Sequence, residues 1–485
     1  MLREKVRRIG IVVVVLCLLG GVCYGQKPFE GVKLTALIGA GGEAPLLTYH
    51  VDYLKEKLGV DFEIINEPDP NHYQLLMKDW MTGEGTYDIV TSVPRWNGDF
   101  MGGGYFLPIT EYLKKDSEAM KDYEDIVDVY RKLYCEWGGE IYGIVVDGDT
   151  QILYYRKDIL ENPDYQARFK EKYGYDLPVP PQTWDQFLDV AEFFTGWDWD
   201  NDGEVEYGAT FSGIDFPPHV YMYWVPIFVS YSNGVLPFDK ELHPQINNEA
   251  GVKALQVFKR VCTEFAPPGY IGMSIVGTWQ AVWNGQVAMA LEWGDVGKYL
   301  LCEERGEGGG LHWKGKFGYS LWPGVEHEGV VVKYNTLSWG RFMAIPRSTK
   351  HPDAAYAVLR ELLRPERKMI SLSDWISCAD VYAYSARDAS KWTIPIEQEF
   401  IDAYLAALAH GVPDIMIPGN EEYYTEFGKI VTSYLQGEFD EKTALSRVEE
   451  TWERITERLG RKKLVDVWTT YVEKTLEGLG FKFKF

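Results

Sequence analysis

Residues 32–93 alternate between apolar runs and amphipathic segments in a pattern that few folds satisfy. Three apolar runs have the length of buried strands: Val32–Gly39, Val60–Asn66 and Tyr87–Val93. Apolar residues at helical spacing connect them, over residues 47–58 and 72–81. This order predicts a parallel, doubly wound sheet. Ligands of such sheets bind beyond the carboxyl ends of the strands, here the loops at residues 41–44 and 94–98.

The rest of the chain continues the α/β pattern beyond one sheet. Further strands are predicted at Tyr142–Val146, Ile152–Tyr155, Val287–Leu291, Phe317–Leu321 and Phe342–Pro346. Thr183–Gln186 is a capping box that opens a helix, Glu249–Phe265 is amphipathic, and residues 395–478 are mostly helical. The first predicted sheet would belong to one lobe of the protein. The strand pair at residues 142–155 is expected to carry the chain out of this first lobe.

The N-terminus has the features of an export signal. Four basic residues precede the apolar run Ile9–Leu19, and Cys23-Tyr24-Gly25 fits a cleavage site. The run is too short to span a bilayer, so we predict a signal peptide at residues 1–25 and a periplasmic or extracellular protein. A retained membrane anchor and lipid attachment at Cys23 stay open as alternatives, although Val22 fits poorly before a lipidated cysteine.

Charge and composition exclude several classes of function. Lys and Arg number 49 against 72 Asp and Glu, and this net charge of −23 argues against nucleic acid as a partner. The 17 Trp and 32 Tyr residues exceed what a core needs and indicate surfaces for stacking ligands. Gly310–Lys316 has the spacing of a phosphate loop, but Phe317 stands where Ser or Thr would hold magnesium. The sequence has no nucleophile elbow and no clustered His, and Cys135, Cys262, Cys302 and Cys378 are compatible with disulfides or free thiols.

The segment Asp198–Glu206 resembles the first half of a calcium loop. The predicted ligands are the side chains of Asp198, Asp200 and Asp202, the Glu204 carbonyl, and Glu206. Ala209 stands where a bidentate acid is expected, so a carboxylate from elsewhere would have to complete the site. We predict a structural Ca²⁺ ion, and a metal-free acidic turn is the alternative.

Two adjoining stretches carry a resemblance to a known family. Tyr142–Asp149, followed by Leu153–Asp158, resembles the crossover region of extracellular solute-binding proteins of ABC importers. The maltose-binding-protein-like sugar receptors (family 1) are the most similar. Further stretches resemble the family in the same order: Tyr87–Val90, Thr183–Phe187, Asp198–Gly208, Gly285–Met289 and Ala344–Ala355.

The resemblance implies an α/β, two-lobed periplasmic-binding-protein-like fold of type II. Each lobe would be a doubly wound sheet flanked by helices, and the lobes would close around ligand by a hinge. Lobe one would comprise residues 27–148 and 324–362, and lobe two residues 149–323 and 363–485 with a helical C-terminal tail. We expect a monomer.

Matching the family residue by residue implies a set of ligand contacts. They are Gly41, Gly42, Glu43, Arg95 and Trp96 in lobe one, Asp147 and Asp149 at the hinge, His219, Tyr221, Trp224, Glu292, Trp293 and Asp295 in lobe two, and the late residues Tyr384, Ser385 and Arg387. Trp293 would stack on a sugar face and Asp295 would accept from its edge. Core packing is an alternative for Trp224, a plain turn for Asp149, and an internal hydrogen bond for His219.

The sequence therefore predicts a receptor, not an enzyme. It would bind a carbohydrate, expected to be an oligosaccharide, and deliver it to the membrane permease of an ABC transporter. One alternative is a secreted carbohydrate-active hydrolase with two catalytic carboxylates. The other is a receptor for a non-sugar solute such as a peptide or polyamine, which an acidic cleft would suit.

Overall fold

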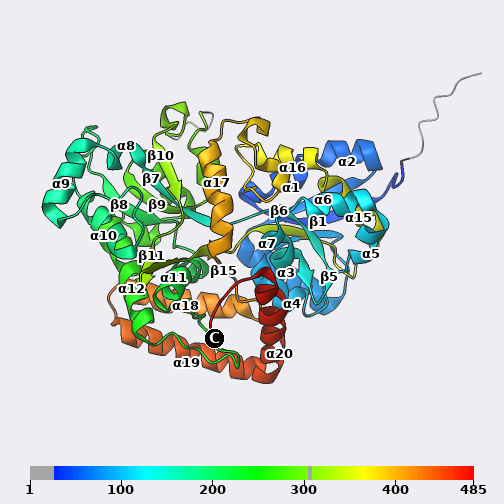
Figure 1. Ribbon diagram of the computed structural model, residues 1–485. Coiled ribbons are helices and arrows are strands. Elements are labelled where there is room, and N and C mark those ends of the chain that lie inside the picture. The colour runs from blue at the N-terminus through cyan, green and yellow to red at the C-terminus, as the bar shows by residue number, and fades with distance from the viewer. Residues whose placement is uncertain (1–26, 304–307) are drawn as a thin grey trace, which may run out of the picture.

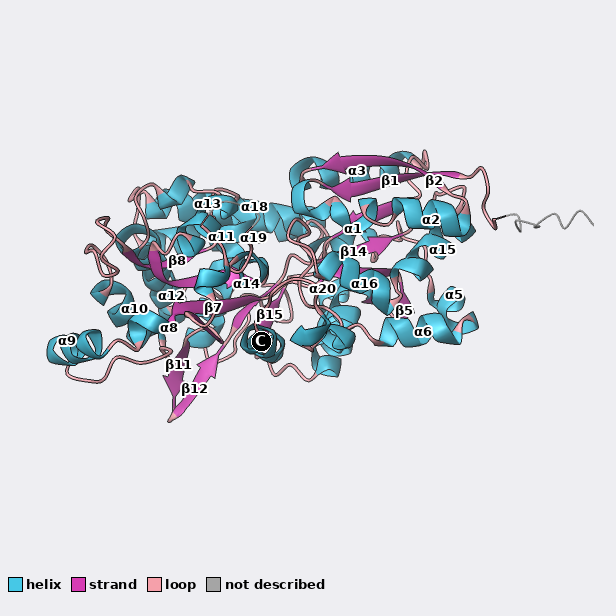
Figure 2. Cartoon of the chain, turned by 90° about the horizontal axis from the view of Figure 1, so that it is seen from above, coloured by secondary structure: helices cyan, strands magenta, loops and turns pink. Residues whose placement is uncertain are grey.

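The computed structural model describes residues 27–303 and 308–485, and the predicted signal peptide lies outside them. The chain forms two lobes side by side, each built on its own β-sheet with helices packed around it (Figures 1 and 2). The predicted α/β, two-lobed fold is confirmed.

Lobe one contains a five-stranded sheet in the order β2-β1-β3-β14-β6. Its strands are β1 Lys33–Gly39, β2 Asp61–Glu67, β3 Ile89–Ser92, β6 Gly143–Asp147 and β14 Arg341–Ala344. β1 runs parallel to β2 and β3, whereas β14 is antiparallel to β3 and β6 and arrives late in the chain. The helices of this lobe are α1 Pro45–Thr48, α2 Val51–Leu58, α3 Asp69–Thr82, α4 Asn97–Phe100, α5 Thr110–Lys115, α6 Ser117–Glu124, α7 Asp128–Tyr130, α15 Pro352–Leu362 and α16 Pro365–Leu372.

Lobe two contains a four-stranded sheet in the order β10-β7-β9-β8. Its strands are β7 Gln151–Arg156, β8 Tyr207–Phe211, β9 Val287–Trp293 and β10 Phe317–Ser320. β7 enters from lobe one and is antiparallel to both of its neighbours, so the sheet is mixed. The helices are α8 Lys157–Leu160, α9 Pro163–Tyr173, α10 Trp184–Phe193, α11 Pro217–Tyr231, α12 Glu249–Arg260, α13 Ile275–Trp283, α14 Asp295–Tyr299, α17 Gln398–Ala407, α18 Asn420–Leu435 and α19 Glu441–Leu459. Thr183 caps α10 as predicted, since its side chain accepts from the Gln186 N–H at 3.3 Å.

The hinge consists of segments that cross between the sheets. Residues 148–150 join β6 to β7, and β13 (Asn335–Leu337) leads through residues 338–340 into β14. The two crossings are hydrogen-bonded, because the Thr150 hydroxyl donates to the Thr336 carbonyl at 2.6 Å and accepts from the Asn335 amide at 2.8 Å. β15 (Gly411–Pro413) pairs with β13, and the remaining short strands form two antiparallel pairs, β4 Glu136–Trp137 with β5 Glu140–Ile141 and β11 Gly324–His327 with β12 Val330–Lys333.

One stretch beyond residue 362 packs on lobe one, whereas we expected it on lobe two. Buried Lys368 of α16 donates to the Asp125 carboxylate at 2.7 Å, and the Tyr384 N–H donates to the Asp125 carbonyl at 2.7 Å. These contacts hold residues 365–385 against α6, and the chain returns to lobe two at α17. The sequence offered no sign of this pairing, because its partners lie more than 240 residues apart.

The C-terminal tail contacts both lobes. The tail begins with α20 (Arg461–Tyr471), at the lower edge of Figure 1. The Trp468 indole N–H donates to the Asp239 carbonyl of lobe two at 3.0 Å. The Tyr471 ring stacks on Trp137 of lobe one, with 6.4 Å between ring centroids and 8° between planes.

Two further expectations concern the cysteines and the membrane. Among the described residues, Cys135, Cys262, Cys302 and Cys378 are free thiols, so these four do not pair with one another. In the part of the chain that the structure describes, every helix is too short or too polar to cross a membrane.

Candidate functional site

A cavity of about 620 Å³ lies between the two lobes. The loop after β1, the end of β6 and the start of β14 line it from lobe one, and α11, α13, the end of β9 and α14 line it from lobe two. The lining residues are Ala40, Gly41, Gly42, Glu43, Asp147, Asp149, His219, Ile275, Val276, Trp279, Trp293, Asp295, Tyr299, Trp339, Arg341, Ile376 and Cys378. β1, β6 and β9 all end at this cavity, which is the position where doubly wound sheets bind ligands.

Three tryptophans from separate segments line the cavity. Trp279 lies on α13, Trp293 ends β9, and Trp339 lies in the hinge. The Trp279 indole N–H donates to the Glu292 carboxylate at 3.1 Å, and that of Trp293 donates to the Tyr223 hydroxyl at 3.3 Å. Because both indole N–H groups are satisfied within lobe two, these rings offer mainly apolar surface to the cavity.

Trp339 has an unusual backbone conformation. Its φ of 81° lies in the left-handed region, which a bulky residue adopts at a cost of about 1–3 kcal/mol. The chain is fixed there by close packing, because a Cβ on the next residue, Gly340, would lie 2.5 Å from the Tyr134 ring. The Trp339 ring lies 4.6 Å from His219 and 4.3 Å from the Arg95 guanidinium. A hinge residue is thus positioned as part of the cavity wall.

Three buried carboxylates meet at one side of the cavity. Asp149, Asp295 and Asp380 each place one oxygen within 4.8 Å of the others. Burial raises the pKa of Asp295 to about 7. Burial and the neighbouring acids raise the pKa values of Asp149 and Asp380 well above their usual range. Asp147 adjoins this triad and accepts from the Asp380 N–H at 2.8 Å.

Two basic side chains accompany these acids. Arg341 donates to the Glu43 carboxylate at 2.6 Å and lies 3.5 Å from that of Asp149. Lys298 of α14 instead donates to the carbonyls of Ser377 and Ala379, at 2.9 and 2.7 Å. Burial outweighs the attraction of Arg341 and raises the pKa of Glu43 to about 7.

His219 presents an acceptor to the cavity. Its Nδ1 donates to the Gly213 carbonyl at 2.9 Å, which leaves Nε2 as the unprotonated nitrogen. Nε2 is buried and has no hydrogen-bond partner among the described residues. Burial lowers the pKa of His219 to about 4, so the ring is neutral at pH 7.

The structure brings eight of the sixteen predicted contacts to this cavity. They are Gly41, Gly42, Glu43, Asp147, Asp149, His219, Trp293 and Asp295. Glu292 points into lobe two, where it accepts from Trp279 and burial raises its pKa to about 8. Trp279, Trp339 and Arg341 also line the cavity but were not among the predicted contacts. Trp339 and Arg341 lie just before the predicted strand Phe342–Pro346, and that position could have identified them.

Arg95 and Trp96 lie outside the cavity, contrary to our expectation. Arg95 is fully buried and donates to the carboxylates of Glu421 at 3.0 Å and Asp69 at 3.2 Å. The Trp96 indole N–H donates to the same Glu421 oxygen at 2.9 Å. Glu421 belongs to α18 of lobe two, so these residues make an interlobe contact whose partner could not be read from the sequence.

Tyr221 and Trp224 also lie away from the cavity, in the core of lobe two. The ring of Tyr221 packs 4.1 Å from Tyr424, and that of Trp224 packs 4.9 Å from Phe427. Helix α11 is covered on all sides, so its aromatic residues fill the core, which was the alternative for Trp224.

Tyr384, Ser385 and Arg387 lie in another part of the molecule. Tyr384 and Arg387 line a second cavity of about 630 Å³, together with α17 and residues 479–483 of the tail. The Ser385 hydroxyl donates to the Asp125 carboxylate at 2.7 Å. The contacts that residues 365–385 make with lobe one determine where these three residues lie.

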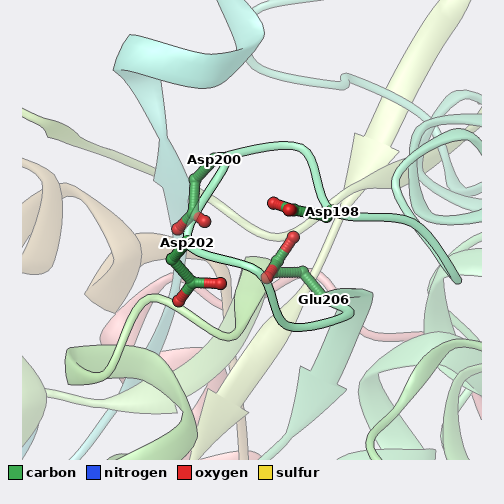
Figure 3. Close-up of side chains that lie close together, drawn as sticks. All are labelled: Asp198, Asp200, Asp202 and Glu206. Atoms are coloured by element: carbon green, nitrogen blue, oxygen red, sulfur yellow. The ribbon is translucent and has the colours of Figure 1, made fainter.

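The acidic loop at residues 198–206 forms a separate cluster. The carboxylates of Asp198, Asp200, Asp202 and Glu206 point toward one another, each with an oxygen within 4.8 Å of the rest (Figure 3). Gly203 has a φ of 96°, and the N–H groups of Asn201 and Gly203 donate to Asp198 at 2.6 and 3.1 Å. One Asp200 oxygen is buried without a hydrogen-bond partner in the described chain. The Glu204 side chain is exposed and lies outside the group.

Comparison with known proteins places the chain among others of this fold. The family model described as bacterial extracellular solute-binding protein matches residues 48–386. A probable amino-acid ABC transporter periplasmic-binding protein of Sinorhizobium fredii is 21% identical over 342 residues, 70% of each chain. An Agrobacterium radiobacter solute-binding protein in complex with ribitol has a TM-score of 0.72 and 22% identity over 88% of this chain and 100% of that one. A maltose-bound T. maritima protein has a TM-score of 0.68 and 18% identity, with 87% and 100% covered.

Proposed function

The chain belongs to the bacterial extracellular solute-binding proteins, and on that premise we propose that it binds a carbohydrate in the interlobe cavity. As a member of this family it is a solute-binding receptor of an ABC transporter, and the membrane permease is its partner. Members of the family are binding proteins, which agrees with the lack of a catalytic motif.

The arrangement of three tryptophans beside carboxylates carries the choice of a carbohydrate. Sugar rings have apolar faces and polar edges, so their receptors combine aromatic faces with a few oriented polar groups. Trp279, Trp293 and Trp339 supply such faces, and Asp147, Asp295 and the hinge acid Asp149 line the same cavity. The ribitol and maltose in the two similar structures support a polyhydroxylated ligand.

Two alternatives are retained. The Sinorhizobium relative is described as an amino-acid receptor, which supports testing a non-sugar solute. The hydrolase remains a chemical alternative because the cavity contains several carboxylates. One binding experiment distinguishes both alternatives from a carbohydrate receptor.

The experiment is thermal unfolding of mature protein, refolded free of ligand, with polyols, mono- and oligosaccharides and amino acids. Because ligand that binds only the folded state raises the Tm, we expect a large increase with one carbohydrate. That carbohydrate should be recovered unaltered afterwards. Cleavage products would identify a hydrolase, and a shift with amino acids alone would contradict the carbohydrate proposal.

A pair of variants tests the cavity itself. Trp279→Ala removes one aromatic face, and we expect at least about tenfold weaker carbohydrate binding in calorimetry. Trp197→Ala is the matched control, because this indole packs on Phe194 away from the cavity. Equal effects of both variants would show that the cavity is not the binding site.

We also propose that the loop at residues 198–206 holds a structural Ca²⁺ ion. Four carboxylates converge there, and an unpartnered Asp200 oxygen faces a group of like charge, which a hard divalent cation would relieve. Burial and the neighbouring aspartates raise the pKa of Glu206 to about 7, the effect expected when that charge is not compensated. The Tm with Ca²⁺ and with a chelator tests this proposal.

Membership of this family implies that the protein is secreted and is periplasmic or extracellular. We propose that residues 1–25 direct this export, with lipid attachment at Cys23 as the alternative to cleavage after Gly25. Mass spectrometry of the mature N-terminus distinguishes a free Gln26 from a lipidated Cys23. The monomeric state remains a prediction that light scattering would test.

A further inference from the structure

The interlobe cavity contains more acid than its basic side chains can neutralise. Five carboxylates line or adjoin it: Glu43, Asp147, Asp149, Asp295 and Asp380. Arg341 and Lys298 are the basic side chains around these acids in the described part of the chain. Arg95 and Asp69 lie farther out and pair with each other. Two basic side chains can neutralise at most two of the five carboxylates, so the acids are in excess by three.

The two basic side chains are already engaged. Arg341 is divided between Glu43, Asp149 and the Trp339 carbonyl. Lys298 donates to two backbone carbonyls. Lys298 attracts Asp295 and Asp380 through its charge, but its hydrogen bonds in the described chain go to these carbonyls, and the remaining Arg341 donor, Nε, is buried without a partner there.

Apart from the buried Arg341 Nε–H, the polar groups offered to a ligand are mainly acceptors. His219 presents Nε2, a buried acceptor without a partner among the described residues. The indole N–H groups of Trp279 and Trp293 are satisfied inside lobe two. A sugar hydroxyl both donates and accepts, whereas an ammonium group has three donors and no acceptor. An ammonium therefore matches this lining better than a hydroxyl does.

From these observations we propose that the ligand is a cationic carbohydrate, a protonated amino sugar, whose ammonium group is bound by Asp149, Asp295 and Asp380. This inference rests on the proposed carbohydrate function and specifies the ligand's charge. Oxygens at about 2.8 Å in tetrahedral directions from one ammonium nitrogen are about 4.6 Å apart. The three carboxylate oxygens lie within 4.8 Å of one another, so one ammonium nitrogen can reach all three.

A metal ion fits this triad less well than an ammonium group. Ca²⁺ takes six to eight oxygen ligands, and the triad supplies three carboxylates in a water-poor, buried position. Tryptophan faces stabilise an organic cation further, because the ring quadrupole attracts positive charge. Trp293 and Trp279 line the same cavity as the triad members Asp149 and Asp295.

The experiment compares oligosaccharides that differ in one substituent. β-1,4-linked glucosamine, N-acetylglucosamine and glucose oligomers of equal length are titrated calorimetrically into ligand-free protein, and corresponding galacto and manno monosaccharides are included. We expect the amino member of one series to bind at least about tenfold more tightly than its hydroxyl counterpart. Binding should also release protons, because an ammonium group displaces protons from acids whose pKa values are raised, and buffers of different ionisation enthalpy reveal that release.

Variants assign the preference to the triad. In Asp295→Asn and Asp149→Asn, the ratio of amino to hydroxyl affinity should fall to near one, because each removes a carboxylate while keeping its shape. Glu171→Gln, on an exposed position of α9, is the control and should leave the ratio unchanged. The Tm of each variant verifies folding, and two independent variants keep the test decisive if one fails to fold.

Each other outcome overturns the inference in a distinguishable way. Equal or tighter binding of the hydroxyl member would reject the cationic ligand and leave the carbohydrate function intact. Binding of a neutral sugar only with added Ca²⁺ would replace the ammonium with a metal. Binding of amino acids but of no sugar would reject this inference together with the proposed function.

Discussion

The molecule contains two acidic clusters that are built in opposite ways. In the loop cluster, Asp198, Asp200, Asp202 and Glu206 come from nine consecutive residues. In the cleft cluster, Asp149, Asp295 and Asp380 come from the hinge, from α14 and from a late segment, and all three are buried. The first cluster is a property of local sequence, whereas the second exists only after both lobes have folded.

The two clusters also differ in the groups that compensate the negative charge of their carboxylates. Backbone N–H groups at Asn201, Gly203 and Glu204 donate to the loop carboxylates, which also reach solvent. The cleft carboxylates have Arg341 on one side, and burial raises their pKa values. The loop cluster thus compensates part of its charge locally and leaves Glu206 and one Asp200 oxygen buried, whereas the cleft cluster is buried throughout and needs a proton or a cation.

Removing the guanidinium from the cleft should have the largest effect on stability. Arg341→Gln leaves Glu43 and Asp149 buried without their basic partner, and we expect a loss of about 3–5 kcal/mol in the free energy of unfolding. Urea unfolding at pH 7 measures it. Arg454→Gln, on an exposed position of α19, is the control and should stay within about 0.5 kcal/mol. A loss below about 1 kcal/mol would show that the cleft acids are not stabilised by Arg341.

The loop cluster should respond to metal. With Ca²⁺ at about 100 times its Kd, the free energy of unfolding should rise by about 2.7 kcal/mol, and Asp200→Asn should abolish most of this increase. The Tm with Ca²⁺ and with a chelator measures it. Asp402→Asn, an exposed acid on α17, should retain the full response. Equal Tm values with Ca²⁺ and chelator in the unchanged protein would refute the metal site.

The cleft cluster should respond to pH. The pKa of Asp295 is raised from 3.8 to about 7, so the unliganded protein loses stability as pH rises from about 4 to about 7, where the folded state must give up its proton. Asn cannot ionise, so Asp295→Asn should gain about 4 kcal/mol relative to the unchanged protein between pH 4 and pH 8. Urea unfolding across this range measures the difference. A difference independent of pH would mean that Asp295 is ionised throughout.

The smallest effect is expected outside both clusters. Arg387 lines the second cavity and packs over Tyr384 at 4.4 Å, far from the interlobe lining. Arg387→Ala should therefore change carbohydrate affinity less than about twofold in calorimetry. A tenfold loss would move the binding site to the second cavity and restore the family-based assignment of Tyr384, Ser385 and Arg387.

The same contrast explains what the sequence could predict. The strands near residues 33, 61, 89, 143, 287 and 341 were recognisable because apolar runs and turn residues are local signals. The same pattern picked out the loop that holds Glu43, whereas Asp149 and Asp295 were found through the family resemblance. Asp380 and the Arg95–Glu421 pair were not, because their partners are separated by more than 80 residues and no periodicity links them.

The tail that contacts both lobes has a consequence for the rate of ligand release. Tyr471 stacks on Trp137 of lobe one and Trp468 is hydrogen-bonded to Asp239 of lobe two, so we expect α20 to favour the closed state. Since the apparent Kd is the intrinsic Kd divided by the fraction of binding-competent molecules, a larger closed fraction lowers the apparent Kd and tightens binding. It also lengthens the residence time of the ligand, and the permease has to supply the work of opening the receptor.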